Sequence, residues 1–474
     1  MAYRPMVGLE VHAQLLTDAK MFCGCAAEFG ADPNSNCCPI CTGMPGSLPV
    51  PNRRAVEFVI RTGLALGCSV ADYCRFYRKN YFYPDLAKNF QISQYDEPLT
   101  FGGSIDLQAD GEPFTIRIRR AHLEEDTGKN IHLPDGRSLV EYNRSGVPLM
   151  EIVTEPDFTS AEQVREYLVQ LRRILRYLGV STANMEEGAM RCEPTVNLVD
   201  EENDAATPKV EIKNLASFKA VYQAVKYEID RQRWCLENDS PMQQETRRWN
   251  ETDSKTTVMR TKESAEDYMY FPEPDLVPLQ PDSAWVEEIR AELPELPRKR
   301  QQRFIDEFDL PEYDAGVLTE SKQMADFFEA AATACGNPKA VSNWVMGDLS
   351  RMLNETGDTP ETAPVEPQQL ADLIRLIDEG TISNDIAQDI FPDVYNGADP
   401  ESIIEERGLS LISDTGELEA LVVEAIEANP QAAEDFRGGR DKALGAMMGY
   451  IMGQTQGQAD ARLVNEMLRE KLNE

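Results

Sequence analysis

The first 290 residues combine two spacings of apolar side chains. Residues 116–119 and 210–214 alternate apolar and charged positions, which is typical of strands with one buried face. Residues 160–178 and 218–236 instead carry apolar side chains every three or four positions, which predicts amphipathic helices. This part of the chain therefore predicts a mixed α/β domain.

Beyond residue 290 the spacing predicts helices alone. The proline-rich stretch 270–281 interrupts the earlier pattern, so we expect a domain boundary shortly after it. Three prolines in 354–368 predict a linker. Helical spacing recurs over residues 285–303, 317–334, 341–353 and 460–472. The fold class expected from the pattern is α+β, with a mixed α/β part followed by helical parts.

The length and composition indicate a large protein that can bury a hydrophobic core of its own. A chain of 474 residues at 42% hydrophobic is expected to divide into two to four domains. No apolar run approaches the roughly 18 residues that cross a membrane. The first residues lack the apolar region of a signal peptide, so we expect a cytoplasmic protein without a membrane partner.

The formal net charge of −35 restricts the possible partners. Phosphate binding requires lysine and arginine, so this charge argues against a broad nucleic-acid-binding face. Acids are spread along the whole chain, which resembles the surface of salt-adapted proteins. A simply acidic, water-exposed surface is the alternative.

Clustered acids and histidines suggest a cation site. The run 119–129 places His122 beside Glu124 and Glu125 and ends in a glycine and a lysine. Glu10 and His12 share one face of a short predicted strand. Such groups hold a hard divalent cation, and a neighbouring lysine suits the phosphate that the cation would neutralise. A solvated acidic face is the alternative for the run 119–129.

Three further segments repeat this combination of charges. Residues 184–193 and 210–214 again combine acids with a cation, and 78–85 mixes cations with aromatic rings. The last mixture suits a nucleotide or an RNA end, or else an aromatic turn in the core. No P-loop, Rossmann glycine motif or G-x-S-x-G occurs. Together the clusters favour a phosphoryl-transfer site within the first 215 residues.

Five cysteines lie close together near the N-terminus. Cys23-x-Cys25 is followed after twelve residues by Cys38-x-x-Cys41, and two such pairs can form a tetrahedral zinc site. A site closed by four sulfurs is structural rather than catalytic. Cys37 is a spare thiol beside the second pair, and buried free cysteines are the alternative.

These motifs together resemble one family across essentially the whole chain. The chain is similar to the B subunit of the bacterial glutamyl/aspartyl-tRNA(Gln/Asn) amidotransferases, the GatB family. The matching segments are residues 7–12, 23–41, 78–86, 122–126, 142–149, 185–188, 211–215, 267–276, 343–349 and 463–472.

The resemblance implies an architecture. It predicts a cradle-shaped catalytic domain over 1–292, which contains the zinc segment 23–41. It then predicts a helical domain over 293–406 and a small helical tail over 407–474, related to the YqeY proteins, that helps to hold tRNA.

The resemblance also implies a ligase reaction. ATP phosphorylates the side-chain carboxylate of Glu or Asp esterified to tRNA(Gln) or tRNA(Asn), and ammonia then displaces the phosphate. An amidase-type A subunit supplies the ammonia from glutamine, and a small C subunit completes the heterotrimer. Mg²⁺ and ATP would act in the reaction, and Zn²⁺ would be structural.

The roles implied for individual residues follow from the family motifs and the chemistry. The expected Mg²⁺ ligands are Glu10, His12, Glu124, Glu125 and Glu211. The expected catalytic residues are Glu10, His12, Glu125 and Lys79. The expected ATP and phosphate contacts are Lys79, Glu187, Gly188, Arg191 and Lys213.

Two alternatives stay open. The chain could be a tRNA-binding scaffold whose acids are structural and whose chemistry belongs to its partners. It could also be an archaeal-type E subunit, although that relative carries an additional domain for which 474 residues leave little room.

Overall fold

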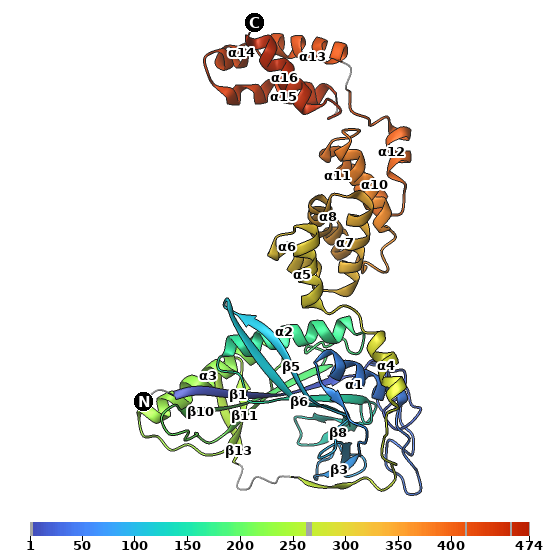
Figure 1. Ribbon diagram of the computed structural model, residues 1–474, viewed down its shortest axis with the longest axis vertical. Helices are drawn as coiled ribbons and strands as arrows, with labels where there is room; N and C mark the ends of the chain where they lie inside the picture. The colour runs from blue at the N-terminus through green and yellow to red at the C-terminus, as the bar shows by residue number, and fades with distance from the viewer. Residues whose placement is uncertain (1–2, 262–267, 413–414, 456, 474) are drawn as a thin grey trace. The chain divides into compact units, whose positions relative to one another are not determined.

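The computed structural model describes residues 3–261, 268–412, 415–455 and 457–473 and forms two compact units, Met1–Leu296 and Pro297–Glu474. The first unit is mixed α/β and the second is helical (Figure 1), so the predicted fold class is confirmed. Asp267, in one of the family motifs, lies outside the described residues.

A large sheet forms the frame of the first unit. Among the described residues it has nine strands in the order β13-β12-β11-β10-β1-β9-β6-β5-β2, and every pairing is antiparallel except β11 with β12. The predicted strands at 116–119 and 210–214 lie in β6 and β11. The strand bounds are β1 (Tyr3–Gln14), β2 (Ser69–Val70), β5 (Thr100–Ala109), β6 (Glu112–Glu125), β9 (Pro148–Thr154), β10 (Met190–Asp200), β11 (Val210–Lys213), β12 (Glu245–Asn250) and β13 (Lys255–Thr261).

The helices of this unit cover the apolar face of the sheet. On β1, Val7, Leu9 and Val11 are buried in the core shared with three helices, whereas the alternate residues face the other side. The three helices are α1 (Arg53–Ala65), α2 (Ala161–Tyr177) and α3 (Phe218–Glu237), and the last two match the predicted helices at 160–178 and 218–236. The Ser160 hydroxyl caps α2 by accepting a hydrogen bond from the Gln163 amide.

Two small sheets flank the frame. One has the order β14-β3-β4, and the other pairs β7 with β8. The stretch 270–281 was expected only to interrupt the pattern, but it contributes to strand β14 because its backbone pairs with β3. The bounds are β3 (Tyr77–Asn80), β4 (Phe90–Ser93), β7 (Lys129–His132), β8 (Ser138–Glu141) and β14 (Met269–Pro272).

The helical regions are more broken than the sequence predicts. A continuous helix over 285–303 is wrong, because Pro294 and Pro297 separate α4 (Ser283–Ala291) from α5 (Pro297–Phe308). A continuous helix over 317–334 is also wrong. The Ser321 hydroxyl accepts a hydrogen bond from the Met324 amide and starts a new helix there. The segment 341–353 is helical but contains a π-helical turn, Val345–Leu349.

The second unit contains two separate hydrophobic cores. One gathers side chains between Phe304 and Ile404, and the other gathers side chains between Leu418 and Leu472. None of the described helices is long and apolar enough to cross a membrane. The helix bounds are α6 (Glu312–Leu318), α7 (Lys322–Cys335), α8 (Pro338–Trp344), α9 (Ser350–Thr356), α10 (Pro367–Asp378), α11 (Asn384–Tyr395), α12 (Pro400–Arg407), α13 (Thr415–Ala428), α14 (Pro430–Arg437), α15 (Leu444–Gln454) and α16 (Ala461–Asn473).

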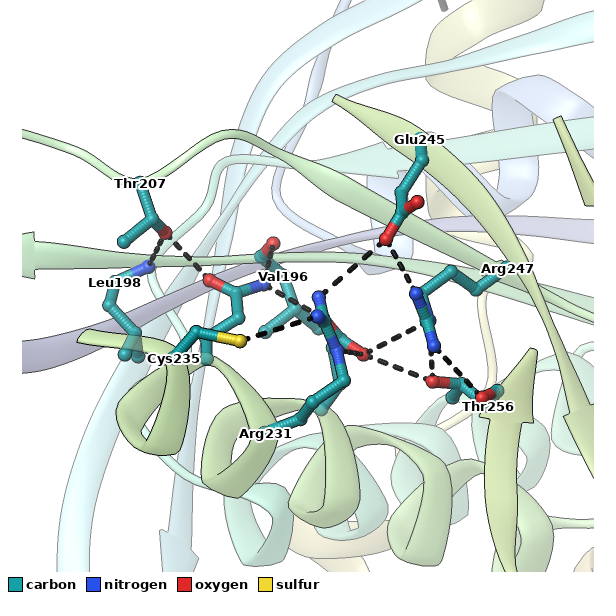
Figure 2. Close-up of polar contacts among 10 residues, drawn as sticks. Val196, Leu198, Thr207, Arg231, Cys235, Glu245, Arg247 and Thr256 are labelled. Atoms are coloured by element: carbon teal, nitrogen blue, oxygen red, sulfur yellow. Dashed lines mark hydrogen bonds and ion pairs between the residues drawn. The ribbon is translucent and has the colours of Figure 1, made fainter. Parts of the chain in front are cut away.

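A buried ion network fastens α3 to the sheet. Figure 2 shows Arg231 on α3 and Arg247 on β12 pointing toward each other, with Glu245 between them. Both arginines also approach the fully buried carboxylate of Glu228, at 2.6 Å and 3.7 Å. Thr256 on β13 donates to the same carboxylate. The helix is thereby tied to two strands at the edge of the sheet.

We expect Glu228→Ala to lower the free energy of unfolding by about 3–5 kcal/mol, because two guanidinium groups would lose a buried counter-charge. Glu287→Ala is the matched control, since Glu287 forms an exposed pair with Arg290 and such pairs contribute about 0–1 kcal/mol. Urea unfolding measures both variants. Equal midpoints would contradict the stabilising role of the network.

Candidate functional site

Strand pairing gathers ionisable side chains on the open face of the sheet. His12 on β1 lies opposite Glu151 on β9 and opposite Arg191 on β10. Glu151 in turn lies opposite His122 on β6. Because side chains alternate along a strand, Glu10 shares this face with His12. One polar surface therefore receives charged groups from four strands.

His12 and Glu151, together with Glu124 on β6, form a compact group of potential metal ligands, which we call the metal group. Ligand atoms of His12, Glu124 and Glu151 all lie within 4.8 Å of one another. His12 Nε2 is 3.4 Å from Glu124 Oε2 and 3.9 Å from Glu151 Oε2. Within the described residues, Glu124 Oε1 is buried yet accepts no hydrogen bond. Two adjacent carboxylates fit a hard cation such as Mg²⁺, which commonly binds one or two carboxylates together with substrate phosphates.

The charges of this group stabilise one another. Burial would lower the pKa of His12, but its hydrogen bond to Glu124 and the charge of Glu151 raise it to about 9. Burial would raise the pKa of Glu124, but Lys79, 3.6 Å away, and His12 hold it below its usual range. The pKa of Glu151 is also well below its usual range, because His122 outweighs the effect of burial. Both acids are thus ionised at neutral pH, and His12 must release a proton to bind a metal.

Glu10 occupies a different environment on the same face. Desolvation raises the pKa of Glu10, and repulsion from Glu151 and Glu193 raises it further, to about 7. The residue nevertheless remains accessible to solvent. Glu10 therefore lies at the open edge of the group, where a cation from solution can reach it.

Two cations lie next to the metal group and are held by acids. Arg191 donates a 2.9 Å hydrogen bond to the buried carboxylate of Asp126, which also accepts one from Gln14. Lys213 contacts Glu193 at 2.6 Å and Glu211 at 3.1 Å. The fixed positions of Arg191 and Lys213 suit phosphate oxygens.

Besides Glu10, two further expected metal ligands, Glu125 and Glu211, lie outside the group of His12, Glu124 and Glu151. The Glu125 carboxylate faces away from His12, pairs with Lys88 and accepts a 2.9 Å hydrogen bond from the Ile92 amide. Glu125 and Lys88 line a cavity of 240 Å³ that also contacts the cysteine segment. Glu211 contacts Lys213 and accepts a hydrogen bond from Thr246.

The other expected contacts lie near the end of β1. Glu187 and Gly188 line a cleft of 550 Å³ together with Gln14, Lys129 and Arg144. This cleft lies on the Gln14 side of His12. Gln14, which lines the cleft, and Arg191 both donate hydrogen bonds to Asp126, so Arg191 lies near the cleft.

Sequence reasoning missed Glu151 as a member of the site, and it placed His122 and Asp126 in the acidic run 119–129 without assigning either a role. Glu151 is the single acid in a strand whose residues are all buried, and that isolation was the available signal. His122 donates to or accepts from Ser93 and contacts Glu151 at 3.1 Å. Strand β4 also supports this region, because Gln91 donates to Glu124 at 3.3 Å.

The cysteine segment forms a second group of potential metal ligands. The sulfur atoms of Cys23, Cys25, Cys38 and Cys41 lie within 4.8 Å of one another. A tetrahedral zinc with Zn–S bonds of about 2.3 Å requires sulfur separations of roughly 3.8 Å, so the four thiols fit zinc. Hydrogen bonding from Cys23, and to a smaller extent the charge of the nearby Lys20, lower the pKa of Cys41 to about 4. The Cys37 sulfur instead contacts Asn143 at 3.9 Å.

Comparison with known proteins shows similarity over the full chain. Residues 5–287 match the model of the GatB/GatE catalytic domain, and residues 326–472 match the model of the GatB domain. Relatives named as the B subunit of aspartyl/glutamyl-tRNA(Asn/Gln) amidotransferase occur in Caldanaerobacter subterraneus (49% identical over 474 residues) and Moorella thermoacetica (50% over 476). A third, from Thermodesulfovibrio yellowstonii, is 48% identical over 475 residues. Each alignment covers 100% of both chains.

We expect the purified protein to contain about one zinc ion per chain, and Cys38→Ser to lose it, because three sulfurs no longer close the tetrahedron. Cys37→Ser is the matched control and should retain the metal. Elemental analysis after dialysis measures both. Equal zinc content in the two variants would contradict the four-cysteine site.

Proposed function

The chain belongs to the GatB family of amidotransferase B subunits, and from this premise we propose that it amidates the side chain of misacylated Glu-tRNA(Gln) and/or Asp-tRNA(Asn). The observation that carries the proposal is the group of His12, Glu124 and Glu151 beside Lys79. A purely structural surface gains little from burying two ionised carboxylates beside each other.

The chemistry requires activation of an inert carboxylate. Its negative charge repels ammonia, and oxide is not a leaving group. In the first step a carboxylate oxygen attacks the γ-phosphorus of ATP, the bond to ADP breaks, and an acyl phosphate forms. In the second step ammonia attacks the acyl carbon, the C–O bond to phosphate breaks, and a proton is released. The products are the amide, ADP and phosphate.

The metal group supports the first step in this proposal. Mg²⁺ bound to His12, Glu124 and Glu151 would offset negative charge on the phosphate oxygens. Lys79 lies next to Glu124 and adds a fixed positive charge where the carboxylate and the phosphate approach each other. Glu10 then orients the cationic part of the substrate.

We place ATP on the Gln14 side of the metal group. The cleft lined by Arg144, Lys129, Glu187 and Gly188 has a volume of 550 Å³, which is within the usual range for small-molecule sites. Arg191 and Lys213 lie on the adjacent sheet surface and would contact the phosphates. ATP would thus extend from this cleft toward His12.

Glu125 suits the second step better than metal binding. Its carboxylate lines the 240 Å³ cavity on the side opposite His12. A carboxylate there can accept a proton from ammonium in that cavity and so release the ammonia that attacks the acyl phosphate. Glu211 acts in this proposal by positioning Lys213.

The remaining roles follow the family. An amidase-type A subunit would supply ammonia from glutamine, and a small C subunit would complete the heterotrimer. We propose residues 1–292 as the catalytic domain, 293–406 as the helical domain and 407–474 as the tail that contacts tRNA. The separate hydrophobic core between Leu418 and Leu472 supports an individual tail domain.

We expect Glu151→Gln to lower ADP release at least about 100-fold, the effect of removing a fixed electrostatic stabiliser. ADP release is measured in the complex with the A and C subunits, with Glu-tRNA(Gln) added. Glu112→Gln, on the exposed end of β6, is the control and should retain wild-type turnover. Glutamine hydrolysis is measured in parallel. Full ADP release by Glu151→Gln would favour the scaffold alternative.

The variant Glu125→Gln separates the two steps. We expect ADP release to persist while the amide formed per ADP falls about tenfold or more, because a proton acceptor is lost but the metal group stays intact. Acid quench with separation of glutamyl and glutaminyl esters measures the amide. If ADP release fell by the same factor as amide formation, Glu125 would act in the first step, as a metal ligand does.

A further inference from the structure

A second groove opens on the polar face, on the side of the metal group opposite the proposed ATP cleft. It has a volume of 160 Å³ and follows β1 from Glu10 back toward its N-terminal end. Its floor is formed where β1 lies beside β10 and β9. The lining residues used below are Met6, Gly8, Glu10, Arg119, Asn197 and Lys209.

The groove contains a buried donor without a partner. Asn197 is 2% exposed, and its side-chain nitrogen donates no hydrogen bond to any described residue. An unsatisfied buried amide costs about 1–3 kcal/mol. A ligand that offers an oxygen or ring nitrogen acceptor at this position would remove that cost.

Two cations border the same groove. Lys209 is exposed and forms no ion pair within the described ranges, and Arg119 is held by Glu155 at 2.7 Å. Lys209 lies level with Asn197 at the end away from His12, because Val210 pairs with Val196 and Asn197 pairs with Met6. Arg119 instead lies across β9 from Glu10, near the metal group.

We propose that this groove binds the aminoacylated terminal ribose of the tRNA substrate, an inference that rests on the proposed function. The α-ammonium group would face Glu10, the ribose would lie over Gly8, and the 5′-phosphate would face Lys209. Asn197 would donate to a sugar acceptor.

The lengths agree with this placement. At about 3.4 Å per residue, Glu10 lies roughly 7 Å along β1 from His12, and Gly8 lies roughly 14 Å from it. An extended glutamyl group spans about 6 Å from its δ-carboxylate to its ester oxygen, at about 1.3 Å per bond. With the carboxylate at the metal group, the ester therefore reaches Glu10 and the ribose reaches Gly8.

Glycine at position 8 keeps the floor of the groove low. A methyl group added there would contact Pro156 at 3.6 Å, an ordinary packing distance. The fold can thus accept Gly8→Ala, but the added carbon would occupy space above the floor. This provides a variant that narrows the groove without changing its charge.

The groove placement also explains the division of the polar face. The ATP cleft lies beyond Gln14, the new groove lies before Glu10, and the metal group lies between them. Phosphoryl transfer requires the attacking and leaving oxygens roughly in line across the γ-phosphorus. Substrates entering from opposite ends of β1 meet that requirement.

The test measures KM separately for each substrate in the heterotrimer, using ADP release as the readout. We expect Lys209→Ala to raise the KM for Glu-tRNA(Gln) about tenfold, as for a lost contact to a charged group. Gly8→Ala should also raise this KM, because the added carbon narrows the groove. The KM for ATP and the rate of glutamine hydrolysis should stay unchanged. Asn197→Asp, which removes the donor at constant size, should also raise the KM for Glu-tRNA(Gln).

Lys219→Ala is the matched control, because Lys219 is exposed on α3, on the other face of the sheet. It should behave as wild type. A raised KM for ATP in the groove variants would assign the groove to the nucleotide and overturn the inference. Unchanged values for both substrates, with an active wild type, would overturn it while the proposed function stands. Absence of ADP release from the wild type would instead refute the proposed function.

Discussion

The site depends on the pairing of β1 with β9 along one edge and with β10 along the other. Alternation along this strand sends Val7, Leu9 and Val11 to the helices and Glu10 and His12 to the open face. A slip of one residue in either pairing would exchange the two sets. The cost of placing charged groups in the apolar core therefore fixes the register and, with it, the position of every ligand atom.

The second principle of the site is that its charges are balanced locally. Acids of the site are paired with cations from other elements, as in Glu124 with Lys79 of the small sheet, Asp126 with Arg191 of β10, and Glu193 of β10 with Lys213 of β11. Such pairs fix several cations on the polar face of a chain whose formal net charge is −35.

Much of this arrangement was predictable from sequence, and the remainder has a physical reason. Local spacing identified the α+β class, the helices at 160–178 and 218–236, and the shared face of Glu10 and His12. Spacing along one strand carries no information on which residue of a distant strand lies opposite, so Glu151 was missed and the pairing of Asp126 with Arg191 was not predicted. Glu124 and Glu125 are adjacent in sequence and therefore point to opposite sides, a consequence of alternation that the acid run obscured. In the segments 285–303 and 317–334 the apolar spacing is continuous, but prolines in the first and the Ser321 cap in the second divide each predicted helix in two.

Strand β4 belongs to the small sheet with β3 and β14, yet it holds two carboxylates carried by the large sheet. Gln91 donates to Glu124, and the backbone of Ile92 donates to Glu125. The two acids lie on opposite sides of β6 and contact one and the same short strand. A partner that displaces the small sheet would therefore break hydrogen bonds to acids on both sides of β6 at once.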